Sequence, residues 1–206
     1  MTGVQTCALP IYAPVDRRWC LVHATHITPA ESATLAASGA VVGLCPMTEA
    51  NLGDGLFPAP DYLSAGGHYG IGSDSNVLID AAEELRWLEY GQRLSGQARN
   101  LFAAAPGAST GGDLLRGALV GGAQALGAAV EIAVGRSADF VTLDPHHPSL
   151  IGAHGDGWLD GWIFAAGRAG IDSVWRRGRQ VVADGRHVAR AAITARYAAT
   201  LAGLLA

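Results

Sequence analysis

What the chain lacks narrows its class before any motif is considered. It has no excess of basic residues, and the formal net charge of its 206 residues is −4. This charge does not favour binding to nucleic acid or to an anionic membrane. Its three cysteines, Cys7, Cys20 and Cys45, form no CxxC pair, which favours a reducing cytoplasm over a disulfide framework. The uncharged, glycine-containing stretch over residues 117–130 is shorter than the roughly 20 apolar residues of a membrane span. We therefore expect a cytoplasmic protein that binds neither nucleic acid nor a membrane.

The first eleven residues, MTGVQTCALPI, do not continue into the pattern that follows them. They have neither the positively charged region nor the cleavage site of a signal peptide. We interpret residues 1–11 as a non-native leader and leave them out of the fold.

Short apolar runs alternate with helical stretches in the first half of the chain. Half of all residues are hydrophobic and 16% are charged, which is typical of a globular protein. The patterns predict strands at 19–24, 40–45 and 69–73, helices at 30–38, 61–65 and 80–97, and a polar loop at 47–58. Apolar strands separated by helices indicate a parallel sheet. A doubly wound sheet and a (βα)8 barrel both fit, but polar residues at the C-terminal strand ends favour the barrel.

The character changes after a helix expected at 113–126. Strands are expected at 132–144, 173–177 and 180–183, with a hairpin turn at 177–179 and a last helix at 189–205. The expected organisation has four parts, which are a leader over 1–11, a partial barrel over 12–126, a β-sandwich appendage over 127–188 and a C-terminal helix over 189–206.

Two residues at predicted strand ends have side chains suited to catalysis. His23, in VHATH, can orient or deprotonate a water, although the residue taken alone favours a core histidine bonded to a nearby carbonyl. Asp74, in GSDSN, can bind a metal or take a proton, whereas the alternative is a helix cap or Asx-turn. Neither residue decides the matter alone.

The segment CPMTEANLGDG follows the second predicted strand. Long polar loops beside a strand end commonly bind substrate, so Glu49 and Asn51 are predicted substrate-binding residues; a capped surface connection is the alternative. Cys45 is expected to be a small buried side chain rather than a nucleophile, because no basic neighbour lowers its pKa.

Several segments together resemble the formimidoylglutamate deiminases of the amidohydrolase superfamily. The specific ones are GLCPMTEANLGDG and EELRWLEYGQRL, with VHATH and GSDSN shared more widely, and VGRSADFVTLD resembles the superfamily's return into its small β-sandwich domain. The resemblance covers nearly everything from Trp19 onward. It implies a (βα)8 barrel with one divalent metal, usually Zn²⁺. It also implies hydrolysis of N-formimidoyl-L-glutamate to N-formyl-L-glutamate and ammonia, a step of histidine degradation.

The same resemblance assigns roles to the strand-end residues. His23 would end barrel strand six and polarise the water that the metal activates, and Asp74 would end strand eight, bind the metal and take the proton. The HxH pair that the family carries on strand one occurs nowhere in this sequence, and the strand-five histidine has no counterpart. We therefore expect the C-terminal part of a TIM-type hydrolase barrel, comprising strands six to eight, plus most of a β-sandwich. It would be inactive alone and would derive from a homo-oligomeric parent.

Two other hypotheses about the function stay open. One is a different deaminase of the superfamily that acts on a nucleobase. The other is a non-catalytic half-barrel module.

Overall fold

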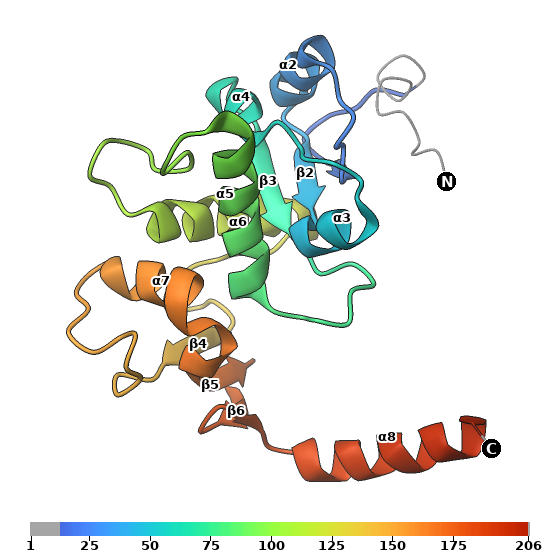
Figure 1. Ribbon diagram of the computed structural model, residues 1–206, viewed down its shortest axis with the longest axis vertical. Helices are drawn as coiled ribbons and strands as arrows, with labels where there is room; N and C mark the ends of the chain where they lie inside the picture. The colour runs from blue at the N-terminus through green and yellow to red at the C-terminus, as the bar shows by residue number, and fades with distance from the viewer. Residues whose placement is uncertain (1–12, 206) are drawn as a thin grey trace.

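The computed structural model describes residues 13–205, so the interpretation of residues 1–11 as a leader lies outside the described part. Figure 1 shows two sheets, each with its own helices, and a last helix that extends away from both. The first sheet is parallel and the second is antiparallel, which makes the described chain an α/β structure.

The parallel sheet has the order β1-β2-β3, formed by β1 (Cys20–Val22), β2 (Val41–Leu44) and β3 (His68–Ile71). All three strands were predicted from their apolar runs. Leu21 pairs with Val42, and both are buried in the hydrophobic core. Neighbouring parallel strands bring their carboxyl ends to the same edge of the sheet.

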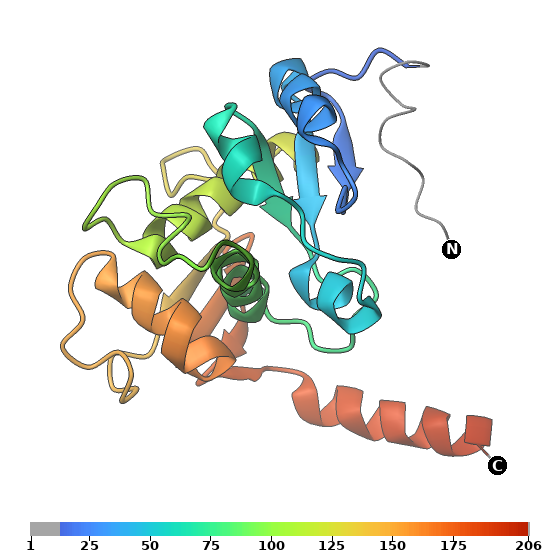
Figure 2. The same ribbon diagram turned by 45° about the horizontal axis from the view of Figure 1, so that its top comes forward.

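Helices cover the core face of this sheet. They are α2 (Pro29–Ser38), α4 (Ala59–Ser64), α5 (Ala81–Gly96) and α6 (Thr110–Leu126), each within a few residues of its predicted position. Helix α5 begins where the Asp80 carboxylate accepts hydrogen bonds from the backbone of the first turn. Figure 2 views α5 nearly end-on, with α3 to one side and the α7–η2 segment to the other.

The prediction of a polar loop over 47–58 was wrong in its first half, which forms α3 (Pro46–Leu52). Pro46 occupies the first turn, where its missing N–H costs nothing, and Gly53 ends the helix with a φ of 71°. A helix of seven residues is too short to show an apolar repeat, so the polar composition alone predicted a loop.

Helix α6 packs closely on β3. A Cβ placed at Gly121 would overlap the carbonyl oxygen of Tyr69, whereas one at Gly122 would meet open space. The Tyr69 hydroxyl also donates to the carbonyl of Leu114 at 2.8 Å. A glycine at position 121 therefore lets the helix backbone approach the strand.

The antiparallel sheet has the order β4-β5-β6-β7, formed by β4 (Phe140–Leu143), β5 (Ile171–Arg176), β6 (Arg179–Ala183) and β7 (Arg186–His187). The hairpin between β5 and β6 was predicted, and its turn residues Arg177 and Gly178 both have positive φ. The strand predicted at 132–144 was too long, because only its last third pairs with β5.

The connection from β4 to β5 contains helices that the sequence did not predict. They are α7 (Gly157–Gly161), the π-helix η2 (Trp162–Ala166) and the 3₁₀ turn η3 (Gly167–Gly170). Ile163 in this segment is fully buried and belongs to the same core as the parallel sheet. The connecting segment is therefore part of the core of the parallel sheet, and Leu143 of β4 packs against that core.

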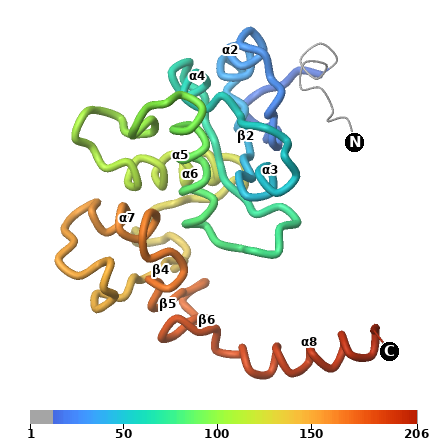
Figure 3. The backbone as a smooth tube through the Cα atoms, viewed as in Figure 1, coloured from blue at the N-terminus to red at the C-terminus, as the bar shows by residue number. Residues whose placement is uncertain are grey.

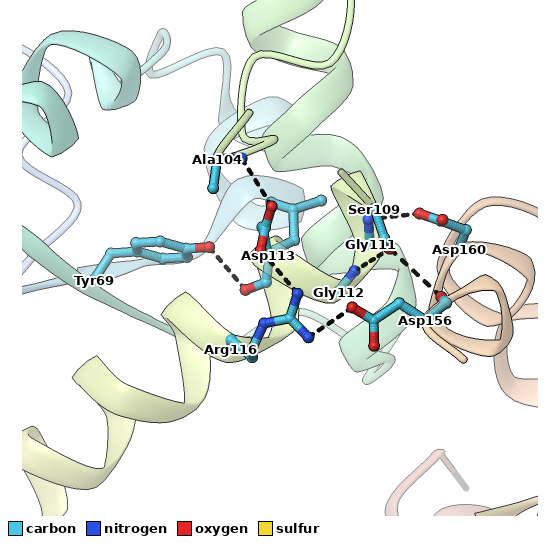
Figure 4. Close-up of polar contacts among 10 residues, drawn as sticks. Tyr69, Ala104, Ser109, Gly111, Gly112, Asp113, Arg116, Asp156 and Asp160 are labelled. Atoms are coloured by element: carbon cyan, nitrogen blue, oxygen red, sulfur yellow. Dashed lines mark hydrogen bonds and ion pairs between the residues drawn. The ribbon is translucent and has the colours of Figure 1, made fainter. Parts of the chain in front are cut away.

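Polar contacts also join α6 to α7 (Figure 4). The backbone N–H of Gly111 donates to Asp160 at 2.7 Å, and Arg116 forms ion pairs of 2.8 Å with both Asp113 and Asp156. These contacts fix the start of α6 against the segment that leads to the second sheet.

The last helix, α8 (Arg190–Leu205), runs away from the rest of the chain, as the tube in Figure 3 makes plain. None of its described residues is buried. Among the helices of the described residues, none has the length and apolar character that crossing a membrane requires.

Candidate active site

Three side chains converge where the parallel strands end. His23 follows β1 directly, Cys45 follows β2, and Asp74 lies three residues after β3. One ligand atom from each lies within 4.8 Å of the others, and the Nε2 atom of His23 is 3.4 Å from Oδ2 of Asp74. The structure thus brings together the two residues that the sequence singled out for catalysis.

Both residues have a backbone conformation that side chains other than glycine rarely adopt. The φ angle is 68° at His23 and 49° at Asp74. His23 still donates its backbone N–H to the carbonyl of Gly43 at 2.8 Å, so the chain leaves the sheet immediately after this bond. Left-handed residues cost about 1–3 kcal/mol and cluster at functional sites, because the surrounding structure must hold them in place.

The carboxylate of Glu49 lies on the other side of the His23 ring. Its Oε1 atom is 3.2 Å from Nδ1 of His23 and accepts the backbone N–H of Cys45 at 2.9 Å. Its side chain is only 6% exposed. Burial raises the pKa of Glu49, while the hydrogen bonds from Cys45 and His23 oppose that rise.

The two predicted substrate-binding residues therefore differ in position. Glu49 is buried against His23, whereas Asn51, on the same helix, is exposed. Their role in substrate binding stays a prediction, and the buried carboxylate of Glu49 is better placed to contact the imidazole.

Two further residues hold α3 in position, and neither was predicted from the sequence. Thr48 donates its hydroxyl to the carbonyl of Ser73 at 3.0 Å, next to Asp74. Glu84 of α5 accepts the backbone N–H of Met47 at 3.0 Å, and its other oxygen has no hydrogen-bond partner among the described residues. Burial raises the pKa of Glu84 to about 7.

The converging side chains fit part of a metal centre. Asp74 supplies a carboxylate and His23 an imidazole, both common zinc ligands. Burial, with Glu49 and Asp74 nearby, raises the pKa of Cys45 to about 12, so its sulfur stays a protonated thiol, in line with the buried side chain expected from the sequence. A zinc site takes at least three protein ligands, and the sequence contains no HxH motif to add them.

The model of the Amidohydrolase family matches residues 8–181, so the chain belongs to the amidohydrolase family. This is a family of hydrolases that act on C–N bonds. The chain is 56% identical over 174 residues to formimidoylglutamate deiminase of Pseudomonas aeruginosa, a match that covers 84% of this chain and 38% of that protein. The resemblance seen in the sequence is confirmed.

More distant relatives act on other substrates. A 5-methylthioadenosine/S-adenosylhomocysteine deaminase of Desulforudis audaxviator is 32% identical over 172 residues, covering 81% of this chain and 38% of that protein. The chain thus spans about two fifths of the length of these curated relatives.

Solved structures agree on the fold. An amidohydrolase from Brucella melitensis superposes with a TM-score of 0.90 at 48% identity, covering 98% of this chain and 44% of that one. An adenosine deaminase from Xanthomonas campestris with bound zinc superposes with a TM-score of 0.74 at 28% identity, covering 88% and 41%.

Proposed function

We propose that this chain supplies three adjacent strand ends of the barrel of a metal-dependent formimidoylglutamate deiminase. The observation that carries the proposal is the 3.4 Å approach of His23 Nε2 to Asp74 Oδ2 at the common edge of three parallel strands. The 56% identity to the Pseudomonas aeruginosa enzyme supports this substrate over an adenine-containing one, since the 5-methylthioadenosine/S-adenosylhomocysteine deaminase is 32% identical.

The proposed reaction hydrolyses N-formimidoyl-L-glutamate to N-formyl-L-glutamate and ammonia. A divalent metal, zinc in our proposal, lowers the pKa of a water and so provides a nucleophile at neutral pH. Asp74 would hold this metal through its carboxylate and accept the proton that the water loses. His23 would polarise the water, and these acid–base groups would deliver a proton to the departing nitrogen as its bond to the amidine carbon breaks.

The chain alone is proposed to be inactive and to hold zinc weakly. Asp74 offers one zinc ligand, with His23 beside it to polarise the water, whereas tight zinc sites have at least three protein ligands. After dialysis against a mild chelator, elemental analysis should find far less than one zinc per chain. Stoichiometric zinc retained through that dialysis would contradict the proposal.

A chimera tests the function directly. The matching segment of the Pseudomonas aeruginosa enzyme is replaced by this chain's aligned 174 residues, which keeps the rest of that relative in place. Ammonia release from N-formimidoyl-L-glutamate is then measured, with the intact relative as the reference. We expect turnover within about tenfold of the relative, since most of the exchanged residues are identical. A folded, zinc-loaded chimera that releases no ammonia would refute the proposed function.

We also propose a location, an oligomeric state and a substrate contact. The parent is taken to be a cytoplasmic homo-oligomer with a small-molecule substrate, as the sequence predicted. Asn51 remains the exposed candidate for contact with that substrate.

A further inference from the structure

Helix α3 touches the ends of all three parallel strands. Glu49 meets His23 at the end of β1 and accepts the N–H of Cys45 at the end of β2. Its neighbour Thr48 donates to the carbonyl of Ser73, beyond β3. One short helix therefore connects both candidate catalytic residues.

In the contact between Glu49 and His23, the imidazole donates and the carboxylate accepts. A carboxylate oxygen accepts hydrogen bonds and donates none, and Oε1 of Glu49 already accepts the N–H of Cys45. At 3.2 Å from this oxygen, Nδ1 of His23 must carry a proton to form a hydrogen bond. The contact of Nε2 with Oδ2 of Asp74, at 3.4 Å, does not have hydrogen-bond geometry, so only the Nδ1 contact fixes a proton. In the neutral ring, Nε2 then keeps its lone pair.

Glu49 is held in place independently of His23. Its side chain is 6% exposed, against 39% for Asp74. Its helix is anchored at one end by Glu84, through the N–H of Met47, and further along by Thr48. Of the two carboxylates beside the imidazole, Glu49 is therefore the more buried, and a backbone N–H also holds it.

We propose that Glu49 is a positioning residue that holds His23 in the Nδ1–H tautomer, which leaves the Nε2 lone pair free to accept a hydrogen bond from the reacting water. Its catalytic meaning rests on the proposed function, whereas the tautomer is a property of this chain that needs neither substrate nor metal. The competing explanation is that Glu49 only caps the start of α3 through the Cys45 N–H.

The ring nitrogens of His23 can be observed in the full chain. The sequence has seven histidines, so ¹⁵N-histidine labelling gives few signals, and the His23→Ala variant identifies those of His23. In chelator-treated protein, at a pH where the ring is neutral, we expect Nδ1 to show the shift of a protonated nitrogen. Free histidine favours the opposite Nε2–H tautomer, so this result requires a specific partner.

Three variants separate positioning from capping. Glu49→Leu removes the acceptor, and we expect most of the His23 population to revert to the Nε2–H tautomer. Glu49→Gln keeps an oxygen in place and should keep most of the Nδ1–H form. Glu131→Gln is the matched control, because Glu131 is exposed and ion-paired with Arg136; it should leave the His23 signals unchanged.

The outcomes are decisive in either direction. An Nε2–H tautomer in the unsubstituted chain, or an unchanged tautomer in folded Glu49→Leu, would overturn the proposal. If Glu49→Leu does not fold, the unsubstituted chain and Glu49→Gln still decide it. In the chimera, Glu49→Leu should lower kcat roughly 10–100-fold with little change in KM, the range seen when a residue that orients a site histidine is lost. A chimera that is inactive without any substitution would refute the function and leave the tautomer result standing.

Discussion

Histidines occur in both sheet regions, and they have different surroundings in each. In the parallel sheet, His23 lies at a strand end between the carboxylates of Glu49 and Asp74. In the antiparallel region, the ring nitrogens of His147 and His187 accept backbone N–H groups two residues further on, at 3.2 and 3.1 Å. Those histidines stabilise turns.

The difference follows from topology. Parallel strands bring their C-terminal ends to one edge, where residues about 50 apart in sequence can meet. The two histidines of the antiparallel region instead accept N–H groups only two residues away in the chain. Convergence of strand ends, rather than the number of histidines, thus marks the candidate site.

The largest expected effects are losses of activity when residues of the parallel-sheet site are substituted. In the chimera, Asp74→Asn should abolish ammonia release and weaken zinc retention, because it removes both a ligand charge and a proton acceptor. His23→Ala should lower kcat roughly 10²–10⁴-fold, the usual contribution of an acid–base group, and leave most of the zinc bound.

His187→Ala is the matched control from the antiparallel sheet, and steady-state assays with zinc analysis compare all three variants. His187 is exposed on β7, so its loss should leave kcat unchanged. Near-normal ammonia release by the His23 variant would remove His23 from the reaction.

The next largest effect concerns the packing of α6 on β3. Gly121→Ala should destabilise the chain by about 3 kcal/mol, because its Cβ would overlap the Tyr69 carbonyl and force the helix away. Gly122→Ala should stabilise it by about 0.5–1 kcal/mol, since the position is open and alanine favours a helix. Urea unfolding of the two variants measures the difference. Equal effects would mean that the close approach is absent in solution.

A buried acid gives the parallel-sheet region a pH dependence. The pKa of Glu84 is about 7 in the folded chain, compared with an ordinary value of 4.5. Its contribution to stability is therefore present in full below pH 4.5 and is lost as the pH rises through about 7. Glu84→Gln should remove this dependence and stabilise the chain at pH 8 on the order of 2 kcal/mol.

Urea unfolding at several pH values measures this effect. Glu131→Gln, an exposed substitution in the segment before β4, should show none of it. A pH dependence that Glu84→Gln leaves unchanged would assign it to another group.

Much of this fold could be predicted, because its strands are continuous apolar runs and its longer helices have recognisable caps. The strand ends at His23 and Asp74 could also be predicted, since a polar residue follows each apolar run within three residues. Helix α3 was missed because its seven residues are mostly polar or small. The contacts of Glu49 with His23 and of Glu84 with Met47 span 26 and 37 residues, and no local pattern encodes them.

The smallest expected effect lies at the far end of the antiparallel region. Deleting α8 should change the free energy of unfolding by less than about 0.5 kcal/mol, because none of its described residues is buried. The helix does carry exposed apolar residues one turn apart, Ile193, Tyr197 and Leu201. Its removal should therefore raise solubility, as measured by sedimentation, without altering the midpoint of urea unfolding. A loss of 2 kcal/mol or more would mean that α8 packs against the sheets in solution, and the contrast between a packed core and a free C-terminal helix would no longer hold.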